Sequence, residues 1–344
     1  MTPDLVTVGG LTVDNVIAAD GTVGLGRAGG NGAYSAVGAL ALVPRVGLVS
    51  HAVASYPADV IARLEAGGVD LGGVRWSADR LTVGNWFIYD ARGDRDERLT
   101  SPPGALAEAG FPTDRLTPDE VAEWRRCLLA RDAAGEESYS EFRTRHPLLP
   151  GQVPPEWLHA RGVHLAPSAL DVMVAMAEAF GGGPGVVTAD AGWQLAGHDL
   201  DALAPLLTRV HAFLPSEVEL RALVPGAGPG DALRVLAGHC AGALAVKLGP
   251  RGALVWDRAA GAAVPVPAET VAAVDPTGAG DAFCGGFLAG LVETGDPVRA
   301  ARFGAVAASR VVGAFGADGA LPVDRAATRA RVERMDAEKV EDAA

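Results

Sequence analysis

Apolar residues along the chain follow two spacings, one typical of buried strands and one typical of helices. A buried strand is expected at residues 5–11 and an Ala-rich apolar helix at 32–43. Further strands are expected at 46–49, 162–166, 185–189, 210–214, 243–248 and 253–256, and further helices at 57–67, 169–180, 199–208, 216–223, 230–240 and 297–314. Strands that alternate with helices form a mostly parallel sheet covered on both faces, so the sequence predicts an α/β fold.

Other segments have a different character. Residues 12–27 are short and punctuated by glycine, which predicts a small hairpin, and residues 81–100 predict a second hairpin with a charged tip at Arg92-Gly93-Asp94. Pro and charged residues dominate 101–160, where only 120–129 has the pattern of a helix and 147–157 is typical of a loop. The charged end at 324–344 is expected to be an exposed helix or a tail.

Three small residues and an acid, Gly278-Ala279-Gly280-Asp281, directly precede an apolar run at helical spacing. The first N–H groups of a helix have no partner inside it and lie at the positive end of its dipole, so they form an anion site that small side chains leave open. Asp281 would then be within reach of an alcohol that reacts with the anion. The alternative is that the glycines serve a tight turn and that Asp281 only complements the dipole.

Composition narrows the classes of protein. The 344 residues are 49% hydrophobic, which supports one large α/β domain or two smaller ones. A formal net charge of −13 disfavours nucleic acid and anionic membranes as partners. Three widely separated cysteines, the lack of a signal-peptide pattern and the lack of an apolar run of about 18 residues predict a cytoplasmic protein without a structural metal or a membrane span.

Four segments together carry a family resemblance. The sequence Asp-Pro-Thr-Gly-Ala-Gly-Asp-Ala-Phe at 275–283 resembles the C-terminal signature of the PfkB sugar kinases, the ribokinase-like family. Residues 6–14 resemble that family's opening strand and substrate-contacting acid, 28–33 its Gly-Gly signature, and 245–252 its nucleotide-binding strand and turn. The segments occur in the family's order and at about its spacing, over roughly residues 5–320.

This resemblance implies a three-layer α/β/α ribokinase-like fold with a mostly parallel central sheet and a small β lid. Residues 1–322 would form the kinase domain, with lid segments at about 12–27 and 81–100, and residues 323–344 would follow as a charged helix or tail. The implied activity is transfer of the γ-phosphoryl group of ATP, with Mg²⁺, to a hydroxymethyl group of a sugar or sugar-like compound. In such reactions the enzyme mainly positions the reactants and neutralises charge.

The resemblance also assigns catalytic roles. Asp281 would be the general base that takes the proton of the attacking hydroxyl, a role that contributes roughly 10²–10⁴-fold. The backbone N–H groups from Gly278 through Ala279 and Gly280 to Asp281 would hold the transferring phosphoryl group.

A second set of residues is expected to bind the acceptor. Asp14 follows the first strand, at the edge where open α/β sheets bind ligands, and its carboxylate can accept two sugar hydroxyls. Gly29 and Gly30 would let the substrate approach the backbone, and Asn31 would hydrogen-bond its hydroxyls. Tyr34 stands where many family members carry Asn, and it either lines the pocket or packs in the core. This difference concerns the identity of the substrate rather than the reaction class.

The nucleotide side is expected at the Lys-x-Gly-x-x-Gly turn. Lys247 would reach a phosphate, and Gly249 and Gly252 would allow close approach, with Thr277 and Ser216 as further contacts. The competing interpretation of Lys247 is a solvated lysine at a strand end.

Two acids are the candidate metal contacts. In the resembled family an Asn-x-x-Glu element lies near magnesium; here Ser216 replaces the Asn, and Glu219 would act through metal-bound water. Ser-x-x-Glu is equally the pattern of a helix capping box. Asp275, with backbone near Thr277 and Gly313, is a candidate site for a monovalent cation such as K⁺.

Several alternatives stay open at this stage. A nucleoside is the second candidate substrate, and a catalytically silent ligand-binding protein on the same fold is the second class of function. A dinucleotide motif at 24–29 is disfavoured because no strong strand precedes it and no acid follows about 20 residues on. His164, near a predicted strand end, either touches substrate or packs in the core. Exposed lid strands often pair with another subunit, so a homodimer is plausible.

Overall fold

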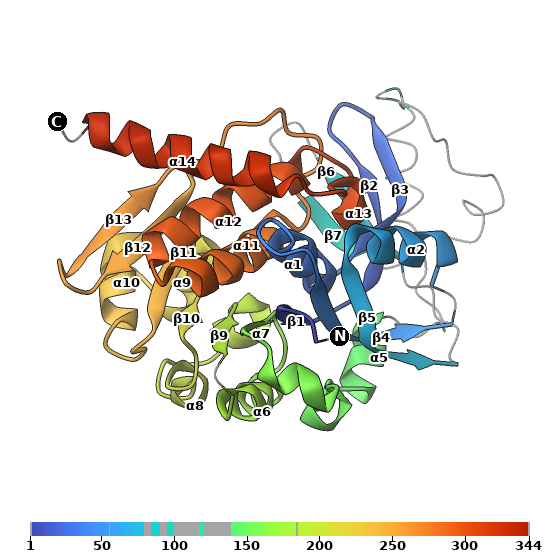
Figure 1. The fold of residues 1–344 in the computed structure, drawn as a ribbon, viewed down its shortest axis with the longest axis horizontal. Helices are drawn as coiled ribbons and strands as arrows, with labels where there is room; N and C mark the ends of the chain where they lie inside the picture. The colour runs from blue at the N-terminus through green and yellow to red at the C-terminus, as the bar shows by residue number, and fades with distance from the viewer. Residues whose placement is uncertain are drawn as a thin grey trace.

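A nine-stranded sheet forms the centre of the fold (Figure 1). The computed structural model describes residues 2–54, 56–78, 84–89, 95–99, 117, 119, 139–183 and 185–342. The strand order is β13-β12-β11-β10-β9-β8-β1-β4-β5, and all pairs from β11 to β5 are parallel, whereas β12 and β13 pair antiparallel at one edge. The strands are β1 (Leu5–Val8), β4 (Val46–Val53), β5 (Val69–Ser77), β8 (Gly162–Leu165), β9 (Val186–Ala189), β10 (Ala212–Phe213), β11 (Ala243–Lys247), β12 (Ala253–Asp257) and β13 (Ala262–Val266).

The two faces of this sheet bury two separate cores. Successive side chains of a strand point to opposite faces, and in β1 Leu5 belongs to one core while Val6 and Val8 belong to the other. The first core is shared with α1 (Asn31–Ala39), α2 (Ala58–Gly67), α5 (Tyr139–Arg145), α11 (Ala279–Thr294), α12 (Pro297–Val312), α13 (Gly316–Gly319) and α14 (Arg325–Asp342). The second is shared with α6 (Leu170–Gly181), α7 (Gly192–Ala196), α8 (Ala204–Leu207), α9 (Glu217–Leu223) and α10 (Pro229–Leu236). The molecule is therefore a three-layer α/β/α structure.

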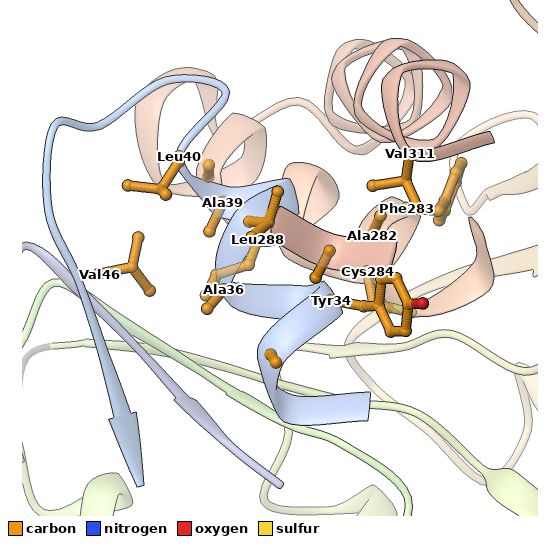
Figure 2. Close-up of a cluster of buried hydrophobic side chains, with 14 of the residues drawn as sticks. Tyr34, Ala36, Ala39, Leu40, Val46, Ala282, Phe283, Cys284, Leu288 and Val311 are labelled. Atoms are coloured by element: carbon orange, nitrogen blue, oxygen red, sulfur yellow. The ribbon is translucent and has the colours of Figure 1, made fainter. Parts of the chain in front are cut away.

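Helices α1 and α11 pack unusually close to each other. A Cβ atom placed on Gly38 would lie 2.1 Å from the carbonyl oxygen of Ala282, and one on Gly285 would lie 1.9 Å from that of Ser35. Figure 2 shows Tyr34 of α1 beside Ala282 and Cys284 of α11. Only glycine permits this approach, which fixes the N-terminal part of α11 against the middle and the C-terminal end of α1.

A separate four-stranded sheet has the order β3-β2-β6-β7 and consists of β2 (Thr12–Ile17), β3 (Val23–Gly29), β6 (Gly84–Tyr89) and β7 (Arg95–Leu99). One buried acid ties it to the body of the protein. The carboxylate of Asp318 in α13 accepts hydrogen bonds from the backbone N–H of Ala28 at 2.8 Å and from Nε of Arg63 in α2 at 2.7 Å. The sheet contains both segments expected to form hairpins, with β3 reaching Gly29.

Several elements differ from the sequence-based expectations. The helix expected at 199–208 is shorter than predicted. Helix α8 begins only at Ala204, because Pro205 favours the first turn of a helix. The strand expected at 210–214 pairs only at Ala212–Phe213, and β1 ends at Val8, before Gly9-Gly10. Strands β5 and β13 and the short helix α7 were not expected. The stretch 147–157 contains 3₁₀ turns at Pro150–Gln152 and within Pro155–His159.

Other expectations have clear outcomes. The glycines at 24–29 lie within β3 and not at a turn between a strand and a helix, so the dinucleotide interpretation is wrong. The charged C-terminal segment forms helix α14, which packs on α12 and pairs Asp336 with Arg302. The expected helix at 120–129 and the expected charged tip at 92–94 lie outside the described residues.

Candidate active site

The first turn of α11 has the geometry that the sequence predicts. Gly278 is the N-cap in the left-handed conformation (φ 73°), and no side chain caps the helix. The N–H of Ala279 donates to the carbonyl of Pro276 at 3.2 Å, and the half-buried Asp281 lies in the first turn. The helix therefore begins on an uncapped turn of small residues with one carboxylate beside it.

Tyr34 lies directly against this turn. A Cβ atom on Gly278 would lie 2.2 Å from Cγ of Tyr34, so any side chain at 278 would clash with the ring, besides being strained by the positive φ. The tyrosine is buried, and its hydroxyl donates a 3.0 Å hydrogen bond to Oδ2 of Asp14. Burial raises the pKa of Tyr34 well above its ordinary value, so the hydroxyl keeps its proton and remains a donor.

Asp14, the acid expected to bind the acceptor, is buried. Its Oδ1 accepts from Nδ2 of Asn85 in β6 at 3.2 Å and from Oγ1 of Thr12 at 3.3 Å. Burial raises the pKa of Asp14 to about 6, and the hydrogen bonds from Asn85, Tyr34 and Thr12 oppose that rise. Gly29 in β3 makes room for the carboxyl group, because a Cβ atom there would lie 2.1 Å from it.

Asn31 and Gly30 join the ends of three elements. Asn31 Oδ1 accepts from the N–H of Gly10 at 2.6 Å, and its Nδ2 donates to the carbonyl of Pro167 at 3.0 Å. Gly30 has φ 94° and lies against the carbonyl of Gly10. In this structure the amide of Asn31 thus holds the loops that follow β1 and β8, at the edge where the acceptor is expected.

The small sheet contacts the loop before α11. The hydroxyl of Tyr89 in β6 lies 2.7 Å from Oγ1 of Thr277, and both side chains are buried. The N–H of Thr277 donates to Oδ1 of Asp275 at 2.9 Å, and the N–H of Asp275 donates to the carbonyl of Val312 at 3.1 Å. The Asp275–Thr277 loop therefore lies between the small sheet and the end of α12, next to Gly313.

Lys247 ends β11 and reaches the first turn of α11 from the sheet. A Cβ atom on Gly280 would lie 3.8 Å from its Nζ. The Nζ atom donates to Oδ2 of Asp190, which directly follows β9, and lies 3.4 Å from Sγ of Cys284. Lys247 is therefore not a solvated lysine, because only 10% of its side chain is exposed.

The remaining expected nucleotide residues follow the same strand ends. Ser216 pairs with Lys247 in an isolated parallel bridge, and Ser216 and Glu219 form a capping box at the start of α9. The capping-box interpretation of this pattern is confirmed, with Glu219 Oε2 accepting from the N–H of Ser216 at 2.6 Å. Gly249 (φ 59°) faces open space, whereas Gly252 (φ 82°) lies against the carbonyl of Val266.

His164 lies in the core of the protein. It is fully buried in β8, and its Nδ1 lies 3.0 Å from Oγ1 of Thr188. Burial, followed by the charge of Lys247, lowers its pKa to about 3, so the ring is neutral. The core interpretation of His164 is the one that agrees with this burial.

Sequence reasoning missed Asn85, Tyr89 and Asp190. Asp190 had a usable signal, because it directly follows an expected parallel strand, at the edge where ligands bind. Asn85 and Tyr89 had none, since only the pairing of β6 with β2 brings them to Asp14 and Thr277. Within the described ranges no group of three or more His, Cys, Asp or Glu residues has the geometry of a metal site, and no helix is both long and apolar enough to cross a bilayer.

Comparison with known proteins gives a consistent family. Residues 156–324 match the model of the pfkB family carbohydrate kinases. The cytidine kinase of Thermococcus kodakarensis is 38% identical over 90 residues, which cover 26% of this chain and 32% of that protein. An uncharacterized sugar kinase of Archaeoglobus fulgidus is 31% identical over 140 residues, which cover 40% of this chain and 53% of that protein. The matched regions span about a third and about half of these two relatives.

The fold is shared much more completely than the sequence. The ribokinase of Arabidopsis thaliana, solved with ribose and ATP, superposes with a TM-score of 0.65 at 21% identity, covering 97% of this chain and 99% of that one. The chain therefore has the ribokinase-like fold. Residues 156–324, which carry the 275–283 motif, are therefore similar to the pfkB family of carbohydrate kinases, and the fold of the chain agrees with that similarity.

Proposed function

We propose that this protein transfers the γ-phosphoryl group of ATP to a hydroxyl, expected to be a hydroxymethyl, of a sugar or sugar-like acceptor. One observation carries the proposal: the acceptor-side residues and the nucleotide-side residues meet at the same helical turn. Tyr34, bonded to Asp14, contacts that turn at Gly278, and Lys247 approaches it at Gly280. A phosphoryl group bound to the turn would thus have the acceptor acid on one flank and a cationic donor on the other.

In the proposed reaction the acceptor lies between Asp14 and Asp281. Asp281 takes the proton of the attacking hydroxyl while the oxygen forms its bond to the γ-phosphorus and the bond from that phosphorus to the β,γ-bridging oxygen breaks. The N–H groups of the turn and the ammonium group of Lys247 stabilise the negative charge on the phosphoryl oxygens. The small sheet, through Asn85 and Tyr89, would act as the lid of a domain that spans residues 1–322.

The proposal includes two ions. Glu219 offers a carboxylate near Lys247 that would hold Mg²⁺ through water, and the metal would neutralise phosphate charge. Asp275 and the backbone near Thr277 and Gly313 would hold a monovalent cation such as K⁺, since the N–H groups of Val274 and Asp275 both donate to Val312 and so bring this loop next to Gly313.

A nucleoside is the second candidate acceptor, favoured by the 38% identity over 90 residues to a cytidine kinase. A silent ligand-binding protein is the competing class, because Tyr34 occupies the space between Asp14 and Gly278.

The test measures ATP consumption across a panel of sugars and nucleosides, with thermal shifts of the same mixtures. Turnover of one acceptor is the expected result; a thermal shift without turnover would favour the binding protein. Asp281→Asn should keep the melting temperature and lower turnover at least a hundredfold, the low end of the effect of a general base. The matched control is Asp296→Asn, at the N-cap of α12, where Asn caps equally well.

A further inference from the structure

Three polar side chains form a buried cluster beside the first turn of α11. Nζ of Lys247 donates to Oδ2 of Asp190 and lies 3.4 Å from Sγ of Cys284, which in turn lies 3.5 Å from the same carboxylate oxygen. The side chains of Lys247 and Asp190 are only 10% and 4% exposed. Lys247 is thus enclosed together with its counter-charge.

The topology explains how the cluster reaches α11. Strands β9 and β11 flank β10, so Asp190 and Lys247 approach each other across the carboxyl end of the short strand between them. On α11, Gly280 and Cys284 are four residues apart and lie on the same helical face. Lys247 therefore runs along this face, with Nζ next to the first turn of the helix.

Folding alone does not account for the pair. A buried ion pair carries a desolvation cost that apolar residues of similar size avoid, so it is weak evidence for a stabilising role. Gly280 is a second and independent observation. Its φ is not in the left-handed region, and the atoms nearest to a Cβ atom there would be those of Lys247, at an ordinary contact distance of 3.8 Å. Glycine is a weaker helix former than alanine, and packing gives no reason for it here.

We propose that Asp190 is a positioning residue that holds the ammonium group of Lys247 against the first turn of α11. There the ammonium group donates a hydrogen bond to the phosphoryl group in transfer. Gly280 keeps the space between Lys247 and the turn open for that group. The inference rests on the proposed phosphoryl transfer. Of the three N–H donors of a lysine, one goes to Asp190 and one to Cys284. The third remains for an oxygen of the ligand.

The charges around Lys247 agree with this role. Burial is the largest single influence and would lower the pKa of Lys247, but Asp190, with smaller contributions from Cys284 and Glu219, outweighs it and raises the pKa, so the lysine keeps its proton. Glu219 on α9 and Cys284 on α11 act in the same direction, Asp281 faces Cys284, and the neutral His164 lies beneath in β8. Without Asp190 the burial would dominate, and the lysine would lose its proton at a lower pH.

The experiment compares Asp190→Asn, Lys247→Met and the double variant with the unaltered chain. Asn retains the acceptor that the N–H of Ala191 uses at 2.8 Å. We expect Asp190→Asn to lower kcat/KM for ATP at least tenfold, to leave KM for the acceptor within about twofold, and to add an alkaline loss of activity below pH 10 that the unaltered chain lacks. The double variant buries no unpaired charge, so its melting temperature should return to that of the unaltered chain. Its kcat/KM should stay as low as that of Lys247→Met.

A purely structural role would give another pattern. The double variant would then regain activity together with its melting temperature, and that result would overturn the proposal. Asp336→Asn, which breaks the remote pair with Arg302 between α12 and α14, is the control that should lower the melting temperature without changing KM for ATP. Failure of the unaltered chain to transfer phosphate would reject the proposed function and the inference together, whereas normal kcat/KM in Asp190→Asn would reject the inference alone.

Discussion

The hydroxyl of Tyr34 donates a 3.0 Å hydrogen bond to Oδ2 of Asp14, so the acid expected to bind the acceptor is already paired with a protein hydroxyl. An acceptor that bonds to Asp14 must either share this carboxylate with the tyrosine or displace it. Because the ring of Tyr34 also lies against Gly278, this side chain links the acceptor acid to the start of α11.

Tyr34→Phe should shift the pH dependence of acceptor use. Asp14 accepts substrate hydroxyls best when it is ionised, and the bond from Tyr34 lowers its pKa, which burial has raised to about 6. Removing the bond raises the pKa further, so the acidic fall of kcat/KM for the acceptor should move to higher pH. KM for ATP should not change. If the acidic fall of kcat/KM stays at the same pH, the tyrosine does not lower the pKa of Asp14.

Asp14 should also make stability depend on pH. Its folded-state pKa of about 6 exceeds the ordinary value of 3.8, so the folded chain binds the proton more tightly than the unfolded chain does. The stabilisation is complete below pH 4 and is lost as the pH rises through 6. About two pKa units correspond to about 3 kcal/mol. Denaturant unfolding at pH 4.5 and 7.5 spans most of this fall, so the free energy of unfolding of the unaltered chain should drop by about 2 kcal/mol between them and that of Asp14→Asn by less. Equal drops in the two chains would show that Asp14 does not carry the raised pKa.

Two glycines of the same turn should respond in opposite ways to alanine. Gly278→Ala forces a side chain into the left-handed region and into the ring of Tyr34, which should destabilise the fold by 2 kcal/mol or more, since the conformation alone costs roughly 1–2 kcal/mol. Gly280→Ala meets no close atom and should leave stability unchanged or raise it by up to about 1 kcal/mol. It should nevertheless lower kcat/KM for ATP.

Thermal unfolding and steady-state kinetics of both variants test this pair. A Gly280→Ala enzyme with normal kinetics would mean that no ligand approaches the backbone at this position. A Gly278→Ala chain as stable as the unaltered one would mean that Tyr34 moves away from the turn at little cost.

Asp318 should hold the small sheet to the body of the protein. Its fully buried carboxylate accepts from the N–H of Ala28 and from Arg63, so Asp318→Ala leaves a buried donor and a cation without their acceptor. We expect a loss of about 3 kcal/mol in unfolding free energy, in the range found when one partner of a buried pair is removed. Arg63→Ala should cost less, because the arginine is 40% exposed and exposed charges contribute little. Equal losses would contradict this assignment.

The sequence was most informative where one local rule acts alone. The helix after Gly278 begins where the small residues and the apolar spacing predict, and the strand–helix alternation fixed the parallel sheet. It was least informative where pairing between distant segments decides. Strand β5, with its two adjacent glycines, is not a convincing strand by itself and forms because β4 pairs with it.

The candidate site divides in the same way. Residue type and position in the chain singled out Asp14, Gly278 and Asp281, because helix starts and strand ends are local features, and the family resemblance added Lys247. The partners Asn85, Tyr89 and Asp190 come from distant segments, and only the tertiary fold brings them within hydrogen-bond distance. The sequence determined which chemistry the chain carries, whereas the packing of α1 on α11 and the pairing of β6 with β2 decided which groups meet. Contacts between residues far apart in the chain depend on the whole fold, and no local pattern records them.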